Sequence, residues 1–226
     1  IYNRHMKNNI STTEALLDQN KLIDKMKIDD ALHFLLDDQR LAIEAVNKVL
    51  DQIKNVILII EEKFKTHEDG RLIYVGAGTS GRIGYQDGVE LKPTFSWPES
   101  RLSLVIAGGD AALKTSVENA EDNIIDAKKI IEKLKVSEKD CVIGLAASGN
   151  TDFTLTFLEA AKQKNATTIG IGNNIYGKIH SKCDYGILLD TGGEVLAGST
   201  RLKAGTSQKI CLNLISTMLM TRLGRV

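Results

Sequence analysis

Three segments of the chain combine glycines with hydroxyl side chains, a composition suited to holding a phosphate group. They are Gly76–Arg82 (Gly-Ala-Gly-Thr-Ser-Gly-Arg), Ala146–Thr151 (Ala-Ala-Ser-Gly-Asn-Thr) and Thr191–Thr200. Glycines let backbone amides approach a ligand, and hydroxyl groups donate hydrogen bonds to phosphate oxygens. Each segment also precedes a predicted helix, whose N-terminal amides attract an anion. Together the three segments predict an anion-binding site.

The first segment also fits the pattern G-x-G-x-x-G, which occurs in dinucleotide-binding proteins. That fingerprint requires an acidic residue about twenty positions further on, at the end of the second strand, to bind a ribose. Here the second predicted strand ends in Ala107–Gly109, and Glu99 precedes that strand. Thr79 and Ser80 suit a phosphate monoester better than a closely packed pyrophosphate. A dinucleotide-dependent dehydrogenase is therefore a remote alternative.

Short apolar runs that alternate with amphipathic stretches position these segments. The apolar runs predict strands over residues 71–75, 102–107, 140–145, 167–171 and 185–189. Helical patterns between the runs are clearest over 111–134 and 152–164, and a last helix is predicted over 202–223. This alternation predicts an α/β fold with a doubly wound, mainly parallel five-stranded sheet. Ligands of such sheets bind beyond the carboxyl ends of the strands, where the first two segments fall.

The chain before residue 68 differs in character. It has neither proline nor glycine between Ser11 and His67. Apolar residues recur there at helical spacing in one stripe, formed by Ala42, Val46, Val49, Ile53, Val56, Ile60 and Phe64. We expect one long helix, and an earlier helix that begins at a capping box over Ser11–Glu14. The predicted division is an N-terminal helical arm over residues 1–67, for packing or dimerisation, and an α/β domain over 68–226.

Composition restricts the class of partner. Lys plus Arg equals Asp plus Glu at 29 each, so no net charge favours nucleic acid or an anionic membrane. The longest apolar run, Val56–Ile60, is too short to span a bilayer, and the N-terminal residues lack a signal-peptide pattern. Cys141, Cys183 and Cys211 are widely spaced, which predicts buried, reduced thiols. We expect a cytoplasmic protein without a metal or cofactor.

Segments 76–82, 146–149 and 198–206 resemble the sugar isomerase (SIS) fold. Within that fold they are similar to the N-acetylmuramic acid 6-phosphate etherases, which share a subfamily with the glucokinase regulatory protein. The similarity extends from about Ser11 to Val226 and is most specific over Glu194–Gly205. It implies a three-layer fold, a homodimer with composite sites, a phosphorylated amino sugar as ligand and no metal. The implied reaction is removal of the D-lactyl ether to give N-acetylglucosamine 6-phosphate and D-lactate, in peptidoglycan recycling.

The resemblance implies two catalytic carboxyls, Glu90 and Glu121, which would transfer protons during the reaction. From the residues alone, Glu121 is a solvated side chain of a charged helix, whereas Leu91, Pro93 and Phe95 offer Glu90 a partly apolar wall. The residues expected to hold the substrate and its phosphate are Gly78, Thr79, Ser80, Gly81, Arg82, Ser148, Gly149, Asn150, Thr151, Ser199, Thr200 and Lys203.

The chain departs from the family pattern around the first carboxyl. It has Val-Glu-Leu-Lys-Pro over 89–93, where the family usually has Ser-Glu-Cys-Pro-Pro. An ammonium group of Lys92 close to Glu90 would favour the carboxylate and weaken it as an acid. Family members also usually continue beyond the position of Val226. Two alternatives therefore stay open: a non-catalytic sugar-phosphate-binding regulator, and an aldose–ketose isomerase that would keep the C3 substituent of the sugar.

Overall fold

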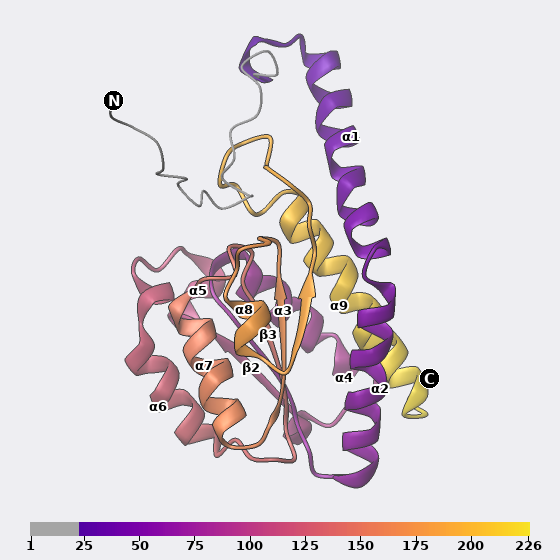
Figure 1. Ribbon diagram of the computed structural model, residues 1–226, viewed down its shortest axis with the longest axis vertical. Coiled ribbons are helices and arrows are strands. Elements are labelled where there is room, and N and C mark those ends of the chain that lie inside the picture. Colours follow the sequence, from indigo (N-terminus) through magenta and orange to yellow (C-terminus); the bar gives the residue numbers. More distant parts are fainter. Residues whose placement is uncertain (1–22) are drawn as a thin grey trace, which may run out of the picture.

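The computed structural model describes residues 23–226 (Figure 1). A 3-10 turn, η3 (Ile23–Lys25), precedes two helices, α1 (Ile28–Asn47) and α2 (Leu50–Thr66). The strands of the described chain are β1 (Leu72–Gly76), β2 (Leu102–Ile106), β3 (Cys141–Leu145), β4 (Thr167–Gly172) and β5 (Tyr185–Leu188). The remaining helices are α3 (Gly78–Val89), α4 (Leu91–Phe95), α5 (Ala111–Lys114), α6 (Ile124–Leu134), α7 (Asp152–Gln163), α8 (Ile179–Lys182) and α9 (Lys203–Arg222), with 3-10 turns η4 (Glu99–Arg101) and η5 (Ala120–Asp122). Every predicted strand is confirmed, because each observed end lies within one residue of the expected end.

The strands form one sheet in the order β2-β1-β3-β4-β5, with every neighbouring pair parallel. The chain therefore adds β2 on one side of β1 and then crosses back to add β3 on the other side. This reversal places the topological switch point between β1 and β3. In doubly wound sheets the crevice at that point is the usual position of a ligand.

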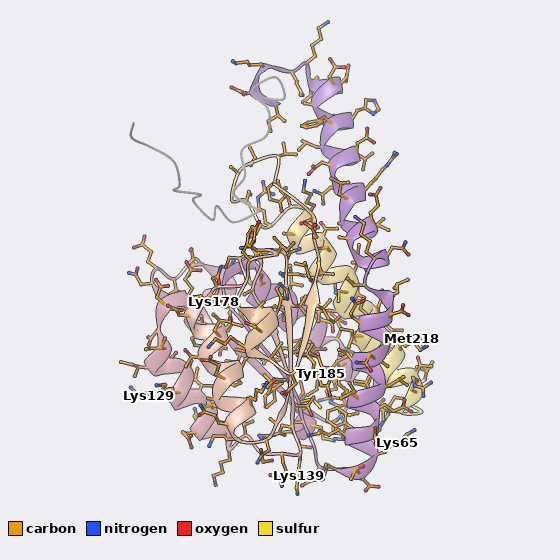
Figure 2. The ribbon with its side chains drawn as sticks, viewed as in Figure 1. Lys65, Lys129, Lys139, Lys178, Tyr185 and Met218 are labelled. Carbon is orange, nitrogen blue, oxygen red and sulfur yellow. The ribbon has the colours of Figure 1, made fainter. Side chains whose placement is uncertain are left out.

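Helices cover both faces of the sheet, as Figure 1 shows. Side chains alternate along β1: Leu72 and Tyr74 join the core under α2 and α9, whereas Ile73 and Val75 join the core under α6 and α7. Both cores are apolar, and exposed charged side chains such as Lys65 and Lys129 lie at the periphery (Figure 2). The predicted three-layer, doubly wound α/β fold is confirmed.

The N-terminal stripe is buried as expected, but the prediction of one long helix is wrong. All seven stripe residues are less than 9% exposed, and α1 and α2 pack along α9. The helix is interrupted at Lys48 and Val49, where the backbone of Val49 leaves the helical region at φ −119°. Neither proline nor glycine marks the interruption, so the sequence contains no local sign of it. The capping box predicted at Ser11–Glu14 lies outside the described residues.

The prediction of one helix over 111–134 is also wrong, because residues 115–123 are not α-helical and separate α5 from α6. Thr115 is extended, and Asn119 has a left-handed backbone at φ 57°. The side chain of Asn123 then caps α6 by accepting a hydrogen bond from the amide of Asp126 at 3.0 Å. Glu121 consequently lies in the turn η5 and not on a helix face.

Two further expectations concern the thiols and the membrane. Cys141, Cys183 and Cys211 are buried and unpaired, as predicted. Burial raises the pKa of the Cys141 and Cys211 thiols to about 12, so neither is a thiolate at neutral pH. Within residues 23–226, no helix combines the length and the apolar character that crossing a membrane would require.

Candidate functional site

The loops after β1 and β3 meet at the switch point and form a pocket of about 380 Å³ together with the segment before α9. The residues that line it are Ala77, Gly78, Thr79, Ser80, Glu121, Asp122, Ala146, Ala147, Ser148, Asn150, Thr151, Gly198 and Thr200. The structure thus brings the three predicted segments together. The second segment begins 64 positions after the end of the first (residue 82 to residue 146).

The first wall of the pocket is the N-terminus of α3. Gly78 has φ 52°, a left-handed backbone that turns the chain from β1 into the helix and that side chains disfavour. No side chain caps α3, and within residues 23–226 the amides of Gly78, Thr79 and Ser80 have no acceptor. Thr79 and Ser80 add hydroxyl groups beside these amides. This end of α3 can therefore donate several hydrogen bonds to an anion.

The second wall is the loop before α7, which also begins without a side-chain cap. The Ser148 hydroxyl oxygen accepts a hydrogen bond from the amide of Asn150 at 3.2 Å, and its O–H remains a donor for a ligand. Gly149 does not line the pocket. Its φ is 69°, and a Cβ there would lie 2.6 Å from Cα of Gly177, so Gly149 permits the close approach of two loops.

The third wall contributes less than predicted, because the N-terminus of α9 is already occupied by a carboxylate of the protein. Glu194, only 1% exposed, accepts a hydrogen bond from the amide of Ala204 at 2.9 Å. Burial raises the pKa of Glu194. Gly198 and Thr200 line the pocket, whereas Ser199 between them does not.

Lys203 was a predicted phosphate partner, but the structure does not bring it into the pocket. Its ammonium nitrogen lies 2.6 Å from a carboxylate oxygen of Asp38 on α1, and the two side chains are 3% and 8% exposed. The pair lines a different hollow, beside the loop at Thr191. Lys203 therefore attaches α9 to α1.

Gly81 and Arg82 complete the first predicted segment, and neither lines the main pocket. A Cβ at Gly81 would lie 2.8 Å from Cγ1 of Ile106 and 2.9 Å from the carbonyl carbon of Gly76, so Gly81 lets α3 pack closely on the sheet. Arg82 instead lines a smaller adjoining hollow.

The two predicted carboxyls lie far apart within one chain. Glu121 lines the pocket, although its side chain is exposed. Glu90 follows the last residue of α3 and is also exposed, which places it about 18 Å from Gly78 along the helix axis at 1.5 Å per residue. Lys92, whose ammonium group could have favoured the carboxylate form of Glu90, pairs with Glu99 instead. Its Nζ lies 2.6 Å from Oε1 of Glu99.

The chemistry available in the pocket follows from its lining. Among the described residues, no lysine or arginine lines it, so amides and hydroxyl groups would hold an anion. Glu121 and Asp122 supply carboxyls for proton transfer. Among residues 23–226, no group of three or more His, Cys, Asp or Glu side chains is arranged to hold a metal ion.

The parallel five-stranded sheet carries hydroxyl-rich loops at its switch point, and the family matches identify it as a SIS domain. Residues 48–162 match the family described as the glucokinase regulatory protein N-terminal SIS domain, and residues 119–218 match the SIS domain family. A putative phosphosugar isomerase involved in capsule formation from Bacteroides fragilis has the same fold. Its TM-score is 0.67 at 18% identity, over 88% of this chain and 93% of that chain.

Two relatives are much more similar in sequence. An N-acetylmuramic acid 6-phosphate etherase of Geobacillus thermodenitrificans is 42% identical over 214 residues, which are 95% of this chain and 72% of the relative. An N-acetylmuramic acid 6-phosphate etherase of Staphylococcus saprophyticus is 40% identical over 218 residues, 96% of this chain and 73% of the relative. The chain belongs to the N-acetylmuramic acid 6-phosphate etherase family.

Proposed function

We propose that the chain is a carbon–oxygen lyase that converts N-acetylmuramic acid 6-phosphate and water to N-acetylglucosamine 6-phosphate and D-lactate. One observation carries the proposal: Glu121 lines the same switch-point pocket as the amides and hydroxyl groups of two helix N-termini. The pocket thereby combines a holder for a phosphate monoester with a group for proton transfer. The names of the relatives agree with this chemistry.

The proposed reaction is an elimination followed by a hydration. In the open-chain sugar, the C1 aldehyde acidifies the C2 hydrogen, and the lactyl ether at C3 is the leaving group. A base removes the C2 proton, the C2=C3 double bond forms, and the C3–O bond breaks as an acid protonates the departing lactate. Water then adds at C3, and C2 regains a proton. Thr79, Ser80 and Ser148 would hold the phosphate, so that the sugar lies in register with the carboxyl groups.

Glu90 can take part only if a second copy of the chain supplies it, because about 18 Å along α3 separates it from the pocket of its own chain. We therefore propose a homodimer with shared sites. Apolar side chains exposed on one stripe of α1 support a partner surface: Ile28, Leu32, Leu36 and Ile43 are 57–70% exposed. A cytoplasmic location is proposed from the buried thiols and the balanced charge.

Shared sites have a direct test in mixed dimers. Glu90→Gln and Glu121→Gln should each lower lactate release by about 10²–10⁴-fold. Random mixing makes half of the dimers mixed, and each mixed dimer keeps one intact site of two. The mixture should therefore recover about a quarter of the wild-type activity. Recovery of no activity would contradict shared sites.

The proposed activity itself is tested by incubating the folded protein with N-acetylmuramic acid 6-phosphate and assaying D-lactate. Binding of the sugar phosphate without lactate would support a regulator. A ketose product that keeps its C3 substituent would support an isomerase. Either of these results would overturn the etherase proposal.

A further inference from the structure

A second hollow adjoins the switch-point pocket. Its volume is about 180 Å³, well above the roughly 10–15 Å³ that one water requires, so it has room for a small organic acid. Ala77, Gly78 and Glu121 line both hollows. Glu121 therefore stands at the junction between them, and a ligand that extends from one hollow into the other passes this carboxyl.

Arg82 supplies the positive charge of the second hollow. It follows Gly78 by four residues on α3, so the two residues share one face of the helix. The guanidinium is held in place by two backbone carbonyls: Nε donates to the oxygen of Ala112 at 2.9 Å, and Nη2 donates to the oxygen of Thr115 at 3.1 Å. These bonds fix the orientation of the group without neutralising its charge.

The guanidinium of Arg82 keeps N–H donors that are not used within the described part of the chain. In the described part of the chain, Nη1 has no hydrogen-bond partner, and no carboxylate lies close enough to form an ion pair with Arg82. Glu118 and Glu121 also line the hollow, but neither pairs with Arg82, and both are exposed to water. A planar guanidinium with free donors is well suited to a carboxylate, which it can bind through two parallel hydrogen bonds.

We propose that the second hollow binds the carboxylate of the lactyl group through Arg82, while the sugar and its phosphate occupy the switch-point pocket. The inference rests on the proposed function, because it takes the substrate from there. It assigns Arg82 to the lactyl arm and not to the phosphate, since Arg82 does not line the pocket of the hydroxyl-bearing loops. It also places the C3–O bond beside Glu121, where both hollows meet. Arg82 is then the residue that selects sugars with an acidic substituent at C3.

The test compares two ligands on each protein: N-acetylmuramic acid 6-phosphate, and its analogue in which the lactyl carboxylate is an amide. Wild-type protein should prefer the acid by about 10- to 100-fold, the loss expected when charge-assisted hydrogen bonds are removed. Arg82→Gln should abolish this preference. Binding of N-acetylglucosamine 6-phosphate, which lacks the lactyl group, should be unchanged. The ratio of acid to amide is measured on one protein at a time. A general loss of folded protein in the variant lowers both values equally and therefore leaves the ratio unchanged.

Arg40→Gln is the matched control, because Arg40 is an exposed arginine on α1 whose partner is Asp37. It should keep the wild-type ratio of acid to amide. The inference is overturned if Arg82→Gln keeps that ratio. It is also overturned if the variant weakens binding of N-acetylglucosamine 6-phosphate as much as binding of the acid, because Arg82 would then contact the phosphate. The ratio is measured as kcat/KM where the protein turns over and as Kd where it does not. A preference that depends on Arg82 without any lactate release would uphold the inference and refute the proposed function.

Discussion

The buried ion pair between Asp38 and Lys203 joins α1 to the N-terminus of α9, and Asp38→Ala tests how much it stabilises the fold. Removing one partner of a buried pair leaves the other charge without compensation, which usually costs about 3–5 kcal/mol. Here the Lys203 ammonium also interacts with the carboxylate of Glu194, which offsets part of the loss. We expect the free energy of unfolding to fall by about 2–3 kcal/mol.

The neighbouring residue provides a matched control. Asp37 lies on the same helix, is 64% exposed and pairs with Arg40 at 3.3 Å. Asp37→Ala makes the same change in helix propensity but removes only a surface pair, so it should cost at most about 0.5 kcal/mol. Both free energies are measured by urea unfolding at neutral pH. Equal losses for the two variants would refute the argument that burial gives the Asp38–Lys203 pair its importance.

Three further predictions concern the pocket and its support. Ser148→Ala should weaken binding of phosphorylated sugars about 5- to 10-fold by calorimetry and leave their unphosphorylated forms unchanged; equal losses would argue against a phosphate contact. Gly81→Ala should lower the free energy of unfolding in urea by about 1–3 kcal/mol, because its Cβ would meet Ile106; an unchanged midpoint would contradict this. Asp87 is a buried residue of α3, and burial raises the pKa of its carboxyl. The stability that its protonated form contributes is complete below the unfolded pKa and is lost as the pH rises through the folded pKa. The stability of Asp87→Asn relative to wild type should therefore increase as the pH rises above the ordinary aspartate pKa of about 4, and a constant difference would show that the shift is absent.

The sheet and its loops were predictable because their signals are local. Strands buried on both faces appear as continuous apolar runs, and β1 and β3 are each followed at once by glycine or small residues. The topology then brings those loops together at the switch point without any side-chain detail. The sequence therefore predicts that Ser80 and Ser148 share a region of the fold although they are more than sixty positions apart, and both line the same pocket.

Contacts between distant residues were not predictable in the same way. Lys203 follows a glycine-rich loop and so resembled a phosphate partner, whereas its actual partner, Asp38, is 165 residues away on another helix. Nothing in the local sequence specifies that pairing. By contrast, the turn that carries Glu121 had a sign in the sequence that we missed, because Asn123 followed by Asp126 is a helix-capping pattern. Helical periodicity on both sides of the turn concealed it.

The central claim is that the switch-point pocket releases lactate by elimination and hydration, and one reaction in ¹⁸O-labelled water tests it most directly. The folded protein is incubated with N-acetylmuramic acid 6-phosphate, and the masses of both products are measured. We predict that D-lactate forms unlabelled, because it keeps the ether oxygen, and that the sugar phosphate gains one ¹⁸O at C3, where water adds. Absence of lactate, or lactate that carries the label, would contradict the account.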